Sequence, residues 1–299
     1  MRLIVDLPVL LFGLGSSTIA WAQVKSLSNS DALSALHPTA FVVAHQDDWQ
    51  LFMGDIAAQT LRKGAPVKFI YLTAGDDGRD SVYWQTRERA AMRSTGVAGE
   101  FTTADSDSSK CAPVVVLRHS IRKCVLGGTE SYFLRLPDGK RNGAGFVRYD
   151  YQSLRRLRAK KIATISAVDG SATYQGWEDL ASTVSELLDG ESDRSPLVHT
   201  TDPSVTVNPH DHFDHRIAGL LIAELKERDS LDVRYYVGYA LGTRAANRSN
   251  EQAREKTAIF LAYDQEMTRL NKNWSAYREH PTFYSDCMLR TYARTPRTR

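Results

Sequence analysis

The 299-residue chain lacks the features that define several large classes of protein. It has three cysteines and no C-x-x-C pair, which argues against a zinc site built from cysteine. Beyond its first residues, no apolar run is long enough to span a bilayer, so no membrane insertion is expected. The net charge is only +3 and there is no basic block, so no nucleic-acid partner is expected. There is no internal repeat, and the sequence does not indicate an oligomeric state.

The N-terminus has the pattern of a secretory signal peptide. Arg2 gives it a positive start, residues 7–14 form a short apolar core, and Ala20-Trp21-Ala22 is a small-x-small cleavage site. The apolar stretch is too short to be a membrane anchor. We therefore expect residues 1–22 to be removed and residues 23–299 to form a single domain. The mature protein is expected to be secreted or periplasmic.

Export would permit a disulfide bond. Cys111 and Cys124 are the nearest pair and flank a β-rich stretch, and Cys287 would then stay free. The alternative is three buried thiols, and the sequence favours neither interpretation.

The first part of the domain alternates buried strands with helices. Short apolar runs predict strands at 39–45 and 67–74, and helical patterns with stop signals follow at about 50–63 and 82–95. A β-α-β-α order predicts a parallel sheet with helices on its faces. We therefore expect an α/β fold with a Rossmann-like, mostly parallel sheet and helices on both faces.

The rest of the chain continues this pattern after an interruption. Residues 111–172 alternate β-prone runs with turn signals and predict a β-rich insertion in the same domain. After it, helices are predicted at about 173–188, 212–227 and 250–271, strands at 196–202 and 233–241, and a frayed tail from Arg290.

Histidine and aspartate gather at the ends of the predicted elements. His45, Asp47 and Asp48 end the first strand, and a polar loop, GDDGRDS, follows the second strand. In parallel sheets the active site lies beyond the carboxyl ends of the strands. A second group, His210, His212 and His215, lies within six residues of the sequence NPHDHFDHR.

These residue types are typical ligands of Zn²⁺ and Fe²⁺. His212 and His215 are three residues apart at a predicted helix start, so both can face one site. A catalytic zinc needs three protein ligands and an open position, and a nearby carboxylate can act as general base. Taken singly, an Asp pair is ordinary helix-cap chemistry, and an H-x-x-H pair can be a solvated helix face. Their coincidence at strand ends favours a metal site.

The paired motifs Ala44-His45-Gln46-Asp47-Asp48 and His212-Phe213-Asp214-His215-Arg216 resemble the signature of the PIG-L-type (LmbE-like) zinc-dependent N-deacetylases, whose usual patterns are A-H-P-D-D-E and H-P-D-H. Weaker similarities are the Thr73-Ala74-Gly75-Asp76 loop, Arg87-Glu88, and the helix with Lys256, Tyr263 and Gln265. The resemblance covers about residues 38–270.

The resemblance implies a role for each matching residue. His45, Asp48 and His215 would hold Zn²⁺, with Fe²⁺ as the other metal that suits these ligands. Asp47 would be the general base. His212 would polarise the tetrahedral intermediate or protonate the leaving amine, and Asp214 would orient His212. The implied reaction removes acetyl from an N-acetylglucosamine-type group of a small-molecule or glycan substrate.

Two positions depart from the family pattern. Gln46 replaces the usual proline and Trp49 replaces the usual acid. Trp49 is expected to pack beneath the site, with stacking on a sugar ring as the alternative. Two other functions stay open: a zinc amidase that acts on another N-acyl substrate, and a non-catalytic sugar-binding relative.

Overall fold

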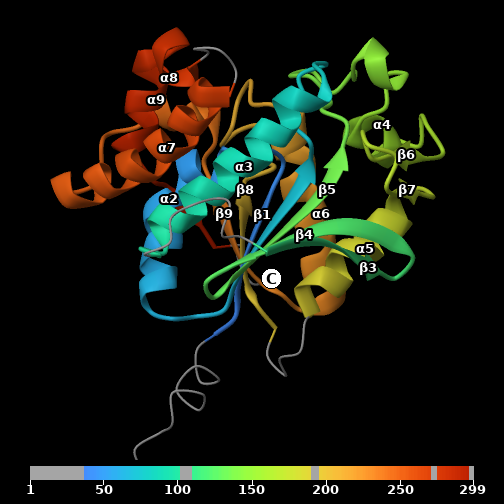
Figure 1. The fold of residues 1–299 in the computed structure, drawn as a ribbon, viewed down its shortest axis with the longest axis horizontal. Coiled ribbons are helices and arrows are strands. Elements are labelled where there is room, and N and C mark those ends of the chain that lie inside the picture. The colour runs from blue at the N-terminus through green and yellow to red at the C-terminus, as the bar shows by residue number, and fades with distance from the viewer. Residues whose placement is uncertain (1–36, 102–109, 190–194, 271–274, 296–299) are drawn as a thin grey trace, which may run out of the picture.

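The computed structural model describes residues 37–101, 110–189, 195–270 and 275–295. They form an α/β protein in which one eight-stranded sheet lies between two layers of helices (Figure 1). The strand order is β10-β9-β8-β1-β2-β5-β4-β3. The expected signal peptide lies outside the described residues.

The five central strands run parallel, as the β-α-β order predicts. They are β1 (Thr39–Val43), β2 (Val67–Thr73), β5 (Thr129–Leu136), β8 (Leu197–Thr201) and β9 (Asp232–Tyr236). Their side chains are buried on both faces because helices cover the sheet on both sides, which explains why they appear in the sequence as continuous apolar runs.

Alternate residues of β1 face opposite cores. Phe41 and Val43 pack in the core on one face of the sheet, and Ala40 and Val42 pack in the core on the other. The first core is covered by α2 (Asp48–Arg62), α3 (Ser81–Ala98), α7 (Asn250–Leu270), α8 (Ala276–Glu279) and α9 (Pro281–Met288), and the second by α4 (Leu154–Arg158), α5 (Trp177–Asp189) and α6 (Phe213–Asp229) (Figure 1). No helix of the described segments is long and apolar enough to cross a bilayer.

The segment predicted as a β-rich insertion is rich in strands, and its three long strands belong to the main sheet. β3 (Lys110–Val116) and β4 (His119–Leu126) pair antiparallel, and β4 pairs antiparallel with β5. The connections are two residues long, 117–118 and 127–128, and such short turns pair neighbouring strands as hairpins. The remaining part holds mostly turns, with η2 (Val147–Tyr149), α4, and the short pair β6 (Ile165–Ser166) and β7 (Thr173–Tyr174).

Other boundaries also differ from the sequence predictions. The helix expected from residue 173 begins at Trp177, and the strand expected to reach residue 241 ends at Tyr236. The 3₁₀ helix η3 (Tyr239–Thr243) follows it. The tail predicted as frayed from Arg290 contains β10 (Ala293–Arg294), which pairs antiparallel with β9. Residues 290–295 are held by long-range contacts, and local sequence patterns do not report such contacts.

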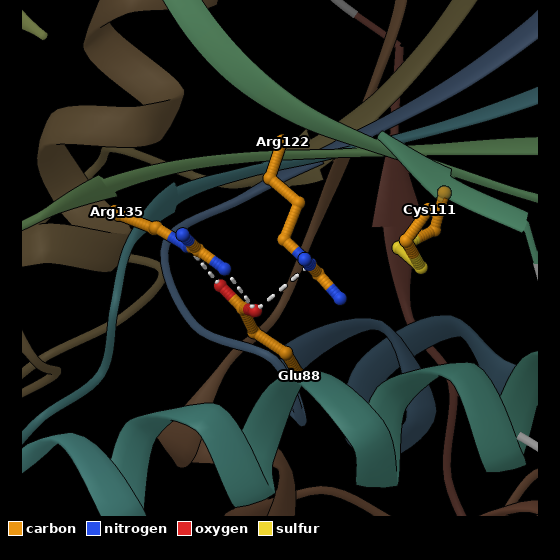
Figure 2. The surroundings of a disulfide bond; sticks show 5 residues. Glu88, Cys111, Arg122 and Arg135 are labelled. Atoms are coloured by element: carbon orange, nitrogen blue, oxygen red, sulfur yellow. Dashed lines mark hydrogen bonds and ion pairs between the residues drawn. A yellow bond between two sulfur atoms is a disulfide. The ribbon is translucent and has the colours of Figure 1, made fainter. Parts of the chain in front are cut away.

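Cys111 and Cys124 face each other across β3 and β4 and form a disulfide, and Cys287 is a buried free thiol. Beside this bond, Glu88 of α3 accepts two hydrogen bonds from Arg135 of β5, at 2.6 and 2.7 Å (Figure 2). Arg122 of β4 lies 3.4 Å from the same carboxylate. This charged cluster connects α3 to the antiparallel part of the sheet.

Candidate active site

The loop after β1 places a histidine and two carboxylates at the carboxyl edge of the sheet. His45 and Asp48 are buried, and the backbone N–H of His45 donates to Asp48 Oδ2 at 2.8 Å. Asp48 is the first residue of α2, where a carboxylate is stabilised by the N-terminal end of the helix dipole. Asp47 is the N-cap residue but makes no side-chain capping bond, so its carboxylate is available for other contacts.

The start of α6 brings two more histidines to this edge. His212 is the N-cap, and its Nδ1 accepts a hydrogen bond from the backbone N–H of Asp214 at 3.2 Å. This bond satisfies one of the N–H groups that a helix start leaves without an intrahelical partner. His215 lies in the first turn and is wholly buried, and Thr201 at the end of β8 donates to its carbonyl oxygen at 2.7 Å.

The two loops bring His45, Asp48 and His215 together. His45 Nδ1 lies 3.1 Å from His215 Nε2, and Asp48 Oδ1 lies 3.0 Å from His215 Nε2 and 3.5 Å from His45 Nδ1. These are three of the residues that the sequence singled out, and they come from segments 167 or more residues apart.

This arrangement fits a tetrahedral metal ion. Two donors bound about 2.0–2.1 Å from zinc at the tetrahedral angle lie roughly 3.3 Å apart. The three observed separations bracket this value, and all three side chains are buried. The donor set of two imidazoles and one carboxylate is also typical of catalytic sites that bind a divalent metal.

The electrostatics of the three donors point to the same conclusion. Burial alone would lower the pKa of His215, but Asp48 and Asp211 raise it to about 10. Burial alone would raise the pKa of Asp48, but His215 and His45 hold it well below its usual value. The site therefore attracts positive charge strongly, and a divalent cation can replace the protons of the two histidines.

Carboxylates also lie beside the ring nitrogens of His45 and His215 that face away from the donor cluster. Asp211 Oδ1 lies 3.0 Å from His215 Nδ1, the ring nitrogen that faces away from the donor cluster. His45 Nε2, likewise on the far side of its ring, lies 3.4 Å from Asp138 Oδ2 and 3.7 Å from Asp214 Oδ2. Such partners fix the tautomer and orientation of metal-binding histidines and raise their basicity.

Asp47 is held at the side of this cluster by Arg87 of α3. Arg87 Nη2 donates to Asp47 Oδ1 at 2.5 Å, and Arg87 Nε donates to Gln46 Oε1 at 3.2 Å. Gln46 in turn donates from Nε2 to the carbonyl oxygen of Thr73 at 2.7 Å. Gly75 makes this packing possible, because a Cβ there would lie 2.7 Å from Gln46 Oε1. Gln46, which replaces the usual proline, thus connects the loops after β1 and β2.

His212 is neutral in this environment and presents its Nε2 towards Asp138. Burial, followed by the nearby His45, lowers the pKa of His212 to about 4. Because Nδ1 accepts the bond from the Asp214 N–H, the ring proton lies on Nε2, which is 3.7 Å from Asp138 Oδ1.

Asp214 was expected to orient His212, and its backbone N–H donates to the His212 ring. Its carboxylate oxygen Oδ2 lies 3.9 Å from His212 Nδ1 and accepts a hydrogen bond from the N–H of Gly139 at 2.7 Å. A side chain at Gly139 would collide with it, since a Cβ there would lie 2.4 Å from Asp214 Oδ1.

Sequence reasoning missed the roles of Asp138 and Asp211 in this cluster. Asp138 follows β5, a parallel strand of the same sheet, in a segment whose turn signals do not indicate a site. Asp211 stands directly before His212, and no pattern in the sequence separates its role from that of the neighbouring histidines. Trp49 packs beneath the site as expected: it is fully buried, contacts Phe69, and donates to the Tyr71 hydroxyl at 2.8 Å.

The fold and the site together define an α/β protein with a buried His/Asp centre suited to a divalent metal. The family model of PIG-L, GlcNAc-PI de-N-acetylase, matches residues 40–226, which is more than half of the chain. The chain belongs to this family, and it is accordingly a hydrolytic N-deacetylase. No curated protein matches the chain.

Solved structures with a similar fold include a triple mutant of a deacetylase from the teicoplanin biosynthetic pathway. It is 13% identical, with a TM-score of 0.49 over 84% of this chain and 88% of that chain. The N,N′-diacetylchitobiose deacetylase from Pyrococcus horikoshii is 14% identical, with a TM-score of 0.42 over 87% and 79%. The 4-carboxy-2-hydroxymuconate hydratase from Pseudomonas putida is 13% identical, with a TM-score of 0.40 over 84% and 83%.

Proposed function

We propose that the protein hydrolyses the acetamide of an N-acetylglucosamine-type sugar or glycoconjugate, with Zn²⁺ held by His45, Asp48 and His215. The observation that carries the proposal is the convergence of these three donors, 3.0–3.5 Å apart, beside Asp47 and His212. A bound zinc ion supplies Lewis-acid polarisation and lowers the pKa of water from about 16 to about 7. The substrate class is supported by the GlcNAc-PI de-N-acetylase family.

Asp47 is placed to accept a proton from the attacking water. Its Oδ1 is engaged by Arg87, and this bond fixes the direction of the carboxylate. The guanidinium forms an ion pair with Asp47 through Oδ1 and does not cover the second carboxylate oxygen. A general base must lie within hydrogen-bond reach of the proton that it removes, and Asp47 is supported for this role by its position on the loop that carries the donors His45 and Asp48.

His212 acts on the carbonyl group of the substrate, whereas Asp47 acts on the attacking water. As a neutral ring with its proton on Nε2, it can donate a hydrogen bond to the carbonyl oxygen as negative charge develops there. The carbonyl carbon then gains the water oxygen, the C–N bond breaks, and the amine nitrogen gains a proton. The products are acetate and a free amine, and the proton taken up by Asp47 balances the one delivered to the amine.

An amine-release assay tests the proposal. We expect turnover of N-acetylglucosamine and its glycosides, loss of turnover with a chelator, and recovery on adding Zn²⁺. The same series with Fe²⁺ compares the two metals that suit this donor set. Turnover of N-acyl peptides without turnover of any N-acetylated sugar would instead establish the amidase alternative. Metal binding without turnover of either class would establish a non-catalytic sugar-binding relative.

We also propose that the protein is exported, with cleavage after Ala22. The support is the leader pattern of residues 1–22 together with the disulfide between Cys111 and Cys124, since disulfides persist in oxidising compartments.

A further inference from the structure

A cavity of about 180 Å³ lies directly beside the candidate metal centre. It is bounded by His210, Phe213 and Arg216, with Asp202, Asn208 and Asp211 on its other sides. Two of these residues flank His212 in the sequence, and Asp211 bonds to His215. The cavity and the surroundings of the metal centre therefore share Asp211.

Arg216, the last residue of the second family motif, brings an uncompensated positive charge to this cavity. Its Nε is buried without a hydrogen-bond partner, and no carboxylate of the described segments pairs with its guanidinium. The guanidinium lies 5.5 Å from the centre of the Phe213 ring. An arginine in this situation lacks the planar, two-pronged partner that its geometry fits best.

Two more arginines, Arg155 and Arg141, contact residues that bound the cavity. The Arg155 guanidinium lies 4.4 Å from the Phe213 ring centre and donates to the carbonyl oxygen of Asn142. Arg141 donates to the carbonyl oxygen of His210 at 2.9 Å. Within the described parts of the chain, neither of these two arginines has a carboxylate partner.

The two acids of the cavity do not pair with Arg216. Asp202 forms a two-pronged ion pair with Arg294, at 2.5 and 2.9 Å. Asp211 Oδ1 bonds to His215 and accepts a hydrogen bond from the backbone N–H of His212 at 2.8 Å, whereas its buried Oδ2 has no hydrogen-bond partner. In the described parts of the chain, neither acid lies within ion-pair distance of Arg216.

We propose that this cavity binds an oxyanion, a carboxylate or phosphate group, through Arg216. Guanidinium recognises both groups through paired, charge-assisted hydrogen bonds. Next to a deacetylase centre the anion has two sources: an acidic group on the sugar substrate, or the acetate that the reaction releases. The inference rests on the proposed function for these sources, but the binding of an anion does not depend on it.

Calorimetric titration of the holoenzyme with inorganic phosphate tests the binding site. We expect saturable binding that Arg216→Gln weakens roughly ten- to a hundredfold. The matched control is Arg228→Gln, an arginine on the same helix that pairs with Glu178 far from the cavity, and it should leave binding unchanged. Equal binding by the wild type and Arg216→Gln, or no saturable binding by the wild type, would overturn the proposal. If Arg216→Gln does not fold, Arg216→Lys replaces it, with binding weaker than in the wild type as the expected result.

Turnover experiments separate the two sources of the anion. If the substrate carries it, the wild type prefers N-acetylglucosamine 6-phosphate to N-acetylglucosamine in kcat/KM, and Arg216→Gln loses the preference. If it is the released acetate, acetate inhibits the wild type competitively, and Arg216→Gln relieves the inhibition without any preference for the phosphorylated sugar. Phosphate binding that depends on Arg216 in a protein that releases no amine would contradict the proposed function alone.

Discussion

Asp47 and Asp48 are neighbours in the sequence but have different partners in the structure. Asp48 points into the cluster with His45 and His215, whereas Asp47 is held by Arg87 at its side. Consecutive residues at a helix start diverge in direction, so one can bind a metal ion while the other stays available to accept a proton. This division makes the two roles separable by mutation.

Asp47→Asn should separate metal binding from catalysis. We expect the variant to keep near-normal metal content, because the three donors are intact, and to lose about a hundred- to ten-thousandfold in kcat, because the base is lost. Metal analysis and amine-release kinetics measure the two quantities. Asp232→Asn, the same change at an exposed position of β9, is the control. Nearly full activity of Asp47→Asn would contradict the assigned role.

His215→Ala should lose metal and activity together. Its ring is wholly buried among Asp48, Asp211 and His45, and its loss removes one of the three donors of the proposed site. The measurement is the metal content after dialysis, together with turnover in excess Zn²⁺. His280→Ala, at an exposed position, should retain both. Full metal occupancy in His215→Ala would show that the ion is held elsewhere.

At the scale of elements, a buried lysine fastens the C-terminal segment to the helices. Lys256 of α7 is fully buried and donates to the carbonyl oxygens of Cys287 and Arg290 and to Thr291 Oγ1, at 2.8, 2.6 and 3.0 Å. Thr291 in turn donates to Asp55 of α2 at 2.8 Å. These bonds hold the segment that leads into β10, which explains why the tail is not frayed.

The stability of the protein should depend on the titration of Lys256. Burial lowers its pKa from 10.5 to about 8, so between these pH values the unfolded state binds more protons than the folded state. The free energy of unfolding should therefore rise with pH over this window, by an amount on the order of 3 kcal/mol. Urea unfolding at a series of pH values measures it. Lys256→Met should lack this rise, whereas Lys63→Met, at an exposed position, should keep it. Parallel pH profiles for the wild type and Lys256→Met would refute the prediction.

The disulfide should stabilise the hairpin of β3 and β4 without affecting catalysis. It closes a loop with a sequence separation of 13, for which the chain-entropy estimate is roughly 3 kcal/mol. We expect the Cys111→Ala/Cys124→Ala variant to unfold at a lower temperature with unchanged kcat, because β3 is the strand at the edge of the sheet. Thiol titration of the unfolded protein should find one free thiol before reduction and three after it. Three thiols before reduction would show that the bond is not formed.

At the scale of the whole molecule, the prediction of a signal peptide concerns the compartment in which the protein acts. We expect the mature protein to begin at Gln23 and to be found outside the cytoplasm of its native host. N-terminal sequencing of protein recovered from the periplasm or medium measures this directly. Recovery of protein with an intact Met1 from the cytoplasm would contradict export.

The amino-acid sequence alone was enough to predict the fold class, the family, and the three converging donors. It could do so because strand and helix periodicity is local, and because the carboxyl ends of parallel strands meet at one edge of a sheet. His45 and His215, far apart in the chain, were therefore expected to approach each other. In the structure His45 Nδ1 lies 3.1 Å from His215 Nε2.

The carboxylates that contact the outer ring nitrogens of these histidines, and the arginine that bonds to Asp47, became known only from the packed structure. Asp138 and Asp211 have no local pattern that distinguishes them from residues of ordinary turns, and the weak family similarity at Arg87 gave no indication of its partner. Their contacts depend on how the loops after β1, β2 and β5 pack against the start of α6. The same holds for the antiparallel extension of the sheet and for the C-terminal tail, because strand pairing and buried hydrogen bonds between distant segments are properties of the packed molecule.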